Sequence, residues 1–139
     1  MSTKGKTILI VDDEEDLNKL FKTFLEINGY KVDTFTDPVD ALYYFRKNLY
    51  DLALLDLKMP KMDGIKLSKK LKNIDPALFF IFITGANKEY IEHLKRDNPE
   101  IEKIVIYKPI WLNELRSIVH TFLSKNQQPH DKKQLLMTL

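Results

Sequence analysis

The stretch DLALLDLKMPKMDG, residues 51–64, decides how the rest of the chain is interpreted. Its first part, residues 51–55, is nearly all apolar and is followed at once by Asp56. A run that is apolar on both faces is typical of a buried strand in a parallel sheet. The second part, residues 57–64, is rich in turn-forming residues and is expected to be a loop. The stretch therefore predicts a buried strand that presents Asp56 at its carboxyl end.

Further short runs of strand-forming residues alternate with amphipathic stretches along the chain. The other expected strands are residues 7–11 (TILIV), 31–35 (KVDTF), 77–83 (ALFFIFI) and 104–107 (IVIY). Helices are expected in five segments, about residues 17–25, 38–47, 65–72, 87–95 and 112–123, and apolar residues recur at helical spacing in the first and the last of them. This alternation predicts an α/β fold, a doubly wound five-stranded parallel sheet with five helices. Its functional crevice would lie at the carboxyl ends of the strands.

Length and composition narrow the function classes. The 139 residues suit one domain, expected at residues 1–123, followed by a polar, flexible tail at 124–139. The net charge of +2 gives no electrostatic footprint for nucleic acid or an anionic membrane. Cysteine is absent, which excludes disulfides, zinc–thiolate sites and thiol catalysis. With no signal peptide and no long apolar run, we expect a soluble, cytoplasmic protein that binds neither membrane nor DNA directly.

The polar residues suited to chemistry fall at the ends of expected strands. Asp12 and Asp13 follow the first strand, Asp56 the third, Thr84 the fourth and Lys108 the fifth. In a doubly wound sheet the first, third and fourth strands lie side by side, so these groups converge. Clustered carboxylates repel one another, and a cation that prefers oxygen ligands, such as Mg²⁺, removes that repulsion. A nucleophilic carboxylate beside a cation, a hydroxyl and an ammonium group favours phosphoryl transfer.

Four motifs, taken in order, give the chain its resemblance to a known family. They are ILIVDDE (8–14), LALLDLKMPKMDG (52–64), FIFITGA (80–86) and YKPI (107–110). Over about residues 6–122 the chain resembles the receiver domain of two-component response regulators, which has a flavodoxin-like fold. The resemblance implies a free-standing receiver, a signalling protein that catalyses its own phosphorylation and dephosphorylation. Its output would be docking to another protein or transfer of the phosphoryl group along a phosphorelay.

By this resemblance, four residues would hold the phosphoryl group and the metal. Asp56 would accept the phosphoryl group from a histidine kinase, a phosphotransfer protein or a small donor such as acetyl phosphate. Asp13 would bind Mg²⁺ directly and Asp12 through a water molecule, with Asp56 and the carbonyl of Lys58 as further ligands. Taken singly, Asp12 or Asp13 could instead be a helix cap and Asp56 a turn residue.

Three further residues would respond to the phosphoryl group. Thr84 would hydrogen-bond a phosphoryl oxygen and Lys108 would pair with it. Tyr107 matches the aromatic residue that turns inward when the threonine moves toward the phosphate. Taken alone, Thr84 could be a turn residue, and Tyr107 an aromatic at the sheet edge with its hydroxyl in water.

The chain departs from the family pattern in three places. The stretch KRDNPEIEK, residues 95–103, is charged where the family often has a Gly-Ala pair, so the neighbouring helix–strand–helix surface and a common dimer mode would be altered. Lys58 places a cation two residues beyond Asp56, where it could pair with a phosphoryl oxygen or with Glu14, or point into solvent. Nothing after Phe122 is long enough for a DNA-binding output domain, so none is expected.

Two groups of residues have ordinary surface explanations. One is a lysine cluster that is expected to be a solvated helix face, with an acidic partner surface as the alternative: Lys66, Lys69, Lys70 and Lys72. The other group shares no metal-ligand spacing and is expected at the surface: His93, His120 and His130.

Three rival functions remain open. A degenerate receiver that acts only as a constitutive binding module would not need the intact set of site residues. A flavin-binding electron carrier would need a phosphate loop after the first strand, where acidic residues 12–15 would repel a phosphate. A phosphatase with an aspartyl nucleophile would need a second carboxylate two residues after Asp56, where Lys58 stands.

Overall fold

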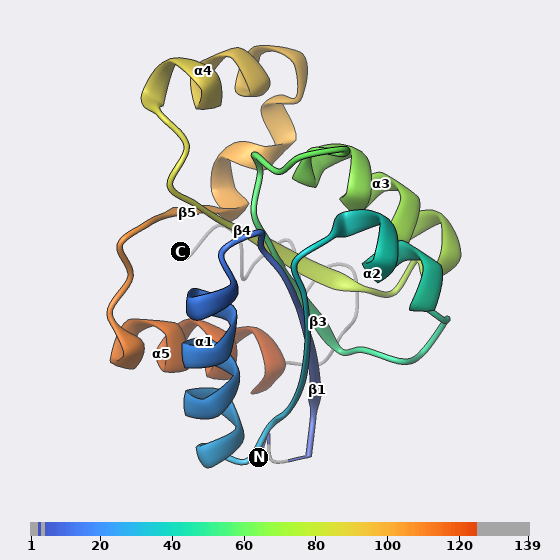
Figure 1. Ribbon diagram of the computed structural model, residues 1–139, viewed down its shortest axis with the longest axis vertical. Helices are drawn as coiled ribbons and strands as arrows, with labels where there is room; N and C mark the ends of the chain where they lie inside the picture. The colour runs from blue at the N-terminus through green and yellow to red at the C-terminus, as the bar shows by residue number, and fades with distance from the viewer. Residues whose placement is uncertain (1–2, 4, 125–139) are drawn as a thin grey trace.

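The computed structural model describes Thr3 and residues 5–124 of the chain. A single parallel sheet with the strand order β2-β1-β3-β4-β5 forms its centre (Figure 1). The strands are β1 (Thr7–Val11), β2 (Lys31–Phe35), β3 (Leu52–Leu55), β4 (Phe79–Thr84) and β5 (Val105–Tyr107). The predicted doubly wound five-stranded sheet is confirmed.

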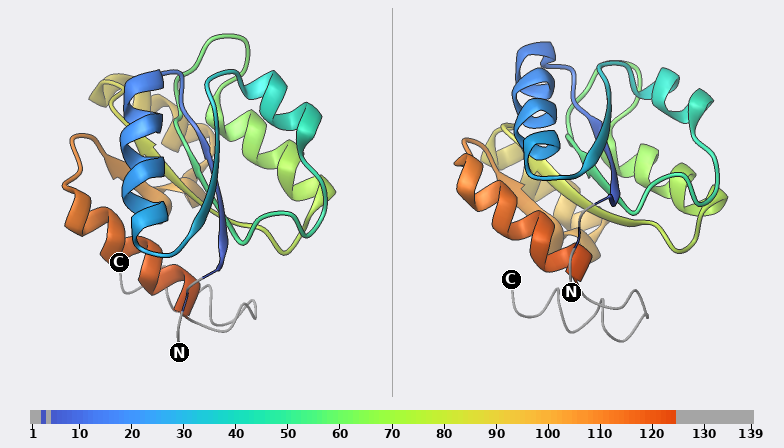
Figure 2. Two further views of the ribbon diagram at one scale, coloured as in Figure 1. Left: turned by 60° about the horizontal axis from the view of Figure 1, so that its bottom comes forward. Right: turned by 90° about the horizontal axis from the view of Figure 1, so that it is seen from below.

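Helices cover both faces of the sheet. α1 and α5 lie on one face, and α2 and α3 lie on the other (Figure 2). The bounds are α1 (Glu15–Ile27), α2 (Pro38–Tyr44), α3 (Gly64–Ile74), α4 (Lys88–Asp97) and α5 (Leu112–Ser124). Successive strand residues point to opposite faces, so Ile8 and Ile10 pack with α1 and α5, whereas Leu9 and Val11 pack with α2 and α3. These two cores hold the carboxyl ends of the strands in register.

Local signals place the ends of two elements as predicted. Asp37 caps α2, since its carboxylate accepts a hydrogen bond from the Val39 N–H at 2.8 Å and Pro38 follows at the first helical position. Asn28 ends α1, and Gly29 then adopts a φ of 95°, which a residue with a side chain rarely takes. The helix α2 nevertheless ends at Tyr44, three residues short of the expected Lys47, where the backbone becomes extended at Phe45 and that ring enters the core.

The charged stretch after α4 differs most from expectation. α4 runs to Asp97, two residues beyond the predicted end, and a 3₁₀ helix that was not predicted, η1 (Pro99–Ile104), follows it. Pro99 disfavours helical backbone at the residue before it, and Asn98 has a φ of −139°. α4 stands away from α3 in Figure 1, with η1 between α4 and the sheet.

The expected tail, residues 124–139, lies outside the described residues except for Ser124, which ends α5. In the described part of the chain, no helix has the length and apolar character that crossing a membrane requires.

Candidate functional site

Four neighbouring strand ends bring the predicted site residues to one edge of the sheet. Asp12 and Asp13 directly follow β1, and Asp56 directly follows β3, which pairs with β1. Oxygen atoms of these three carboxylates all lie within 4.8 Å of one another. Thr84 is the last residue of β4, on the other side of β3. The structure therefore brings together the acidic cluster that the sequence predicted.

Lys108 reaches into this cluster from the end of β5. Its Nζ lies 2.7 Å from Asp12 Oδ2, 3.2 Å from Glu14 Oε1 and 3.7 Å from Asp56 Oδ2. One ammonium group thus faces three carboxylates from two other strand ends. Glu14 was not among the predicted site residues, because its position after Asp12 and Asp13 reads as the beginning of a helix and carries no separate signal.

Burial shifts the pKa values of two of these groups. Desolvation raises the pKa of Asp12, although the hydrogen bond from Lys108 and that from the Glu14 N–H oppose the rise. Burial alone would lower the pKa of Lys108, but the hydrogen bond to Asp12 and the charges of Asp12 and Asp56 outweigh it and raise that pKa. Lys108 therefore stays charged and partly neutralises the buried carboxylates.

Asp56 has one carboxylate oxygen without a partner. Asp56 is buried, and its Oδ1 makes no hydrogen bond among the described residues, a condition shared there only by Asn18 Oδ1. Leaving a buried acceptor unsatisfied costs about 1–3 kcal/mol, and more when the group is charged. An oxygen in this state is suited to a metal ion or to an incoming electrophile.

The helix-cap interpretation of the first two aspartates is not supported. The N-cap residue of α1 is Glu14, and its side chain makes no capping hydrogen bond. Asp12 Oδ1 instead accepts from the Glu14 N–H at 2.9 Å, which orients the turn after β1. Asn18, which sequence reasoning missed, donates from Nδ2 to the Asp12 carbonyl at 2.8 Å and holds that turn against α1.

Thr84 and Tyr107 lie side by side in the register of β4 and β5. Thr84 is fully buried, and its Oγ1 accepts a hydrogen bond from the Ala86 N–H at 3.1 Å. Tyr107 is 48% exposed, so its ring points outward here, with Lys95 Nζ 5.8 Å from the ring centroid. The two residues thus occupy neighbouring strand positions, with Thr84 in the interior and the Tyr107 ring at the surface.

Lys58 lies against α4. Its side chain is exposed, and its Nζ sits 5.3 Å from the centroid of the Tyr90 ring. Glu14, considered above as a partner for Lys58, is paired with Lys108 instead. Tyr90 was not predicted as part of the site, yet its pKa is raised by burial and then by the charges of Asp63 and Asp56.

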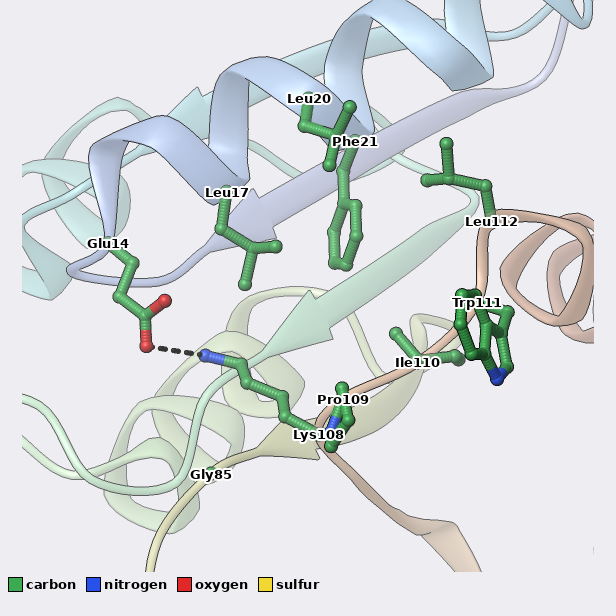
Figure 3. Close-up of a pocket in the computed structure, with 10 residues that line it drawn as sticks. All are labelled: Glu14, Leu17, Leu20, Phe21, Gly85, Lys108, Pro109, Ile110, Trp111 and Leu112. Atoms are coloured by element: carbon green, nitrogen blue, oxygen red, sulfur yellow. Dashed lines mark hydrogen bonds and ion pairs between the residues drawn. The ribbon is translucent and has the colours of Figure 1, made fainter.

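An apolar groove opens directly beside Lys108. It has a volume of about 540 Å³ and lies between the start of α1 and the segment that leads into α5, so we name it the α1–α5 groove (Figure 3). The ion pair of Glu14 and Lys108 closes one end, and Trp111, which is 76% exposed, stands at the rim. The other lining residues are Leu17, Leu20, Phe21, Gly85, Pro109, Ile110 and Leu112.

The two histidines that the structure describes take no part in this site. His93 and His120 are exposed, as expected, and neither joins the acidic group, which is the one candidate metal cluster found among the described residues. His130 lies outside the described residues.

The fold and the site define a class of small α/β proteins in which an acidic cluster and one lysine meet at the carboxyl edge of a parallel sheet. Comparison with known proteins narrows that class. Residues 8–120 match the response regulator receiver domain, and the chain belongs to this family of two-component signalling proteins.

Relatives and solved structures agree with this family. The receiver protein CpdR of Brucella abortus is 33% identical over 118 residues, which cover 85% of this chain and 97% of that protein. GtcR of Aneurinibacillus migulanus is 39% identical over 85 residues, or 61% of this chain, but the match spans only 35% of that regulator.

Two solved structures are similar over nearly their whole length. A CheY-like receiver domain from Methanospirillum hungatei has a TM-score of 0.75 at 27% identity, covering 87% of this chain and 95% of that one. TrrA of Thermotoga maritima, solved in complex with Mg²⁺-BeF, has a TM-score of 0.68 at 28% identity, covering 84% and 98%.

Proposed function

We propose that this receiver domain is a phosphorylation-dependent switch whose acceptor is Asp56. The observation that carries the proposal is the state of that side chain: it is buried, its Oδ1 has no hydrogen-bond partner among the described residues, and its Oδ2 lies 3.7 Å from the Lys108 ammonium group. A carboxylate with a free oxygen beside a fixed positive charge is suited to attack a phosphoryl group and to tolerate the charge that arrives with it.

The transfer requires little beyond positioning. An Asp56 oxygen forms a bond to phosphorus while the bond between phosphorus and the donor's imidazole nitrogen breaks, and the imidazole keeps the electron pair. With acetyl phosphate, acetate leaves in the same way. Lys108 would exchange part of its contact with Asp12 for a phosphoryl oxygen, and Thr84 Oγ1 would donate a hydrogen bond to another.

The acidic cluster fits a magnesium ion. Asp12, Asp13 and Asp56 offer oxygen ligands within 4.8 Å of one another, and Asp56 Oδ1 has no other partner in the part of the chain that the structure describes. Asp13 and Asp56 would bind Mg²⁺ directly, Asp12 through water, and the Lys58 carbonyl would complete the protein's share. When bound, Mg²⁺ would supply positive charge against the phosphoryl oxygens. The similar protein TrrA was solved in complex with Mg²⁺-BeF, which supports a magnesium site in this chain.

Thr84 and Tyr107 would convert the phosphoryl group into a change of surface. The Thr84 hydroxyl now accepts from Ala86, and turning toward the phosphate would vacate space beside β5. Tyr107 is the neighbour of Thr84 across β4 and β5 and its ring is outward, so it could move into that space. The switch would then signal by docking to another protein or by passing the phosphoryl group on.

The α1–α5 groove would receive the phosphodonor protein. It adjoins the site, because Glu14 and Lys108 line both, and its apolar side chains suit a helix that carries a phosphohistidine (Figure 3). A histidine kinase or a phosphotransfer protein is the kind of partner that this arrangement serves.

The test is intact-mass measurement after incubation with Mg²⁺ and acetyl phosphate. The wild-type chain should gain one phosphoryl group, and hydroxylamine should remove it, because an acyl phosphate reacts with that nucleophile. Asp56→Asn should gain none. A constitutive binding module would show no gain in either protein, and equal labelling of Asp56→Asn would place the acceptor elsewhere.

A further inference from the structure

The exposed side of α3 carries an unusual concentration of positive charge. The helix GIKLSKKLKNI contains four lysines and no acidic residue. None of their ammonium groups lies within 4 Å of a carboxylate among the side chains that the structure describes. Lys69 Nζ instead donates to Asn98 Oδ1 at 3.1 Å, and Lys72 Nζ donates to the Pro76 carbonyl at 3.0 Å. Among the described side chains, no close ion pair therefore compensates the charge of this cluster.

Two of these lysines border a groove that we name the α3–η1 groove. It has a volume of about 420 Å³ and lies between α3 and η1, over β4, on the sheet face opposite the α1–α5 groove. α4 stands away from α3, so η1 and not α4 lies beside the groove (Figure 1). The groove combines apolar side chains with the ends of Lys69 and Lys72; its other lining residues are Ile65, Ser68, Asn73, Phe80, Phe82, Glu100 and Ile101.

Lys72 is partly removed from water and lies beside an aromatic ring. Its Nζ lies 5.8 Å from the centroid of the half-buried Phe80 ring. Burial lowers the pKa of Lys72, and the charge of Asp75 only partly opposes that fall. A carboxylate brought to the mouth of the groove would offset this desolvation by pairing with the ammonium group.

We propose that the α3–η1 groove docks an acidic peptide segment of a partner protein, with an apolar side chain against Phe80 and carboxylates against Lys69 and Lys72. The positive charge of the lysines favours an acidic peptide, and the apolar side chains that line the groove favour a peptide with an apolar side chain to bury. Glu100 stands on the η1 side of the groove. It would repel a second row of carboxylates, so acidic residues of the segment would face α3.

The same features disfavour a nucleic acid as the occupant. A polyphosphate backbone is bound by rows of cations and polar groups, whereas the floor here is apolar and Glu100 would face the phosphates. The proposal does not depend on phosphorylation of Asp56, since the groove lies beside α3 and shares no lining residue with that site.

The test selects peptides from a random dodecapeptide display library on the full chain and measures the affinity of the enriched peptides by calorimetry. We expect acidic sequences that contain an aromatic or large aliphatic residue. Lys72→Gln should weaken their binding about tenfold and Lys69→Gln about threefold, because a half-buried pair is screened less than an exposed one. Lys19→Gln is the matched control: its lysine is exposed on α1, on the other face, and binding should not change.

The remaining outcomes are equally decisive. Amide shifts in an NMR titration should concentrate on α3, η1 and β4, and circular dichroism should show that each variant is folded. Selection that yields no binder, binders that lack acidic residues, or equal affinity for wild type and Lys72→Gln would each overturn the proposal. Tighter binding of an unstructured DNA oligonucleotide, with the same loss in Lys72→Gln, would assign the groove to nucleic acid instead.

Discussion

Gly64, the first residue of α3, lies close against the backbone of the strand end that carries Asp56. A Cβ atom added at Gly64 would collide with the backbone carbonyl oxygen of Asp56, and it would stand 2.9 Å from the carbonyl carbon and 3.0 Å from Leu57 Cα. All three atoms belong to the backbone, so no side chain can turn aside. Gly64→Ala must therefore separate the start of α3 from the loop after β3.

The cost of that separation can be worked from the contacts. Ordinary Cβ contacts begin at about 3.4 Å, so the helix or the loop must shift, and the hydrogen bond from the Gly64 N–H to the Leu57 carbonyl, 2.8 Å long, must stretch. Overpacking costs about 1–3 kcal/mol and a weakened hydrogen bond about 0.5–1.5 kcal/mol. We expect Gly64→Ala to lower the free energy of unfolding by about 2–4 kcal/mol.

Urea denaturation measures this loss, and Gly85→Ala is the matched control. A Cβ at Gly85 would meet only the Lys108 side chain, 3.5 Å away at Cδ. That contact is ordinary, and replacing glycine reduces the entropy of the unfolded chain, so this variant should change stability by no more than about 1 kcal/mol. If Gly64→Ala proves as stable as Gly85→Ala, the close approach of α3 to Asp56 is not rigid and the reasoning is refuted.

Three further predictions concern single side chains. Asp13→Ala should weaken Mg²⁺ binding at least about tenfold in calorimetry without lowering apo stability, because an exposed carboxylate that repels Asp12 and Asp56 is removed; undiminished binding would contradict its role. Lys58→Asn should lose the phosphoryl group faster than wild type, since a small amide can orient the attacking water and the lysine cannot. Equal rates in wild type, Lys58→Asn and Lys58→Ala would show that only the Lys58 carbonyl contributes to the site. Tyr50→Phe should cost about 1 kcal/mol at pH 8, because the hydroxyl donates to Asp33 Oδ2 at 2.6 Å. Burial, then Asp33, raises the pKa of Tyr50 above its usual value near 10, so this stability is complete below pH 10 and declines above it; a difference between the two proteins that stays constant up to pH 10.5 would show that the pKa is not raised.

The strand ends of the site were predictable because they depend on the order of strands. Once five strand–helix units alternate, right-handed crossovers place Asp12, Asp56 and Thr84 on neighbouring strands, and no side-chain detail is needed. The carboxylates that pair with Lys108 could not be predicted from the strand order. It depends on which of several carboxylates its side chain reaches, and Glu14 enters through the turn after β1.

The region after α4 was predicted poorly for a different reason. Among its described side chains, η1 buries only Ile101, so this element does not repeat apolar residues often enough to show a period. The contact between Lys58 and Tyr90 was not predicted either. It joins the loop after β3 to α4, so it depends on the position of α4 relative to that loop.

Trp111 gives the chain an optical property that follows from its position. It is the single tryptophan of the 139 residues, and it stands exposed at the rim of the α1–α5 groove. An indole in water emits at a longer wavelength than one packed against apolar side chains. A tryptophan-free protein that covers this groove therefore shifts the emission toward the blue, whereas a tryptophan-free peptide in the α3–η1 groove, on the opposite face of the sheet, leaves the spectrum unchanged. The native fluorescence of the unlabelled chain thus distinguishes which of its two grooves is occupied.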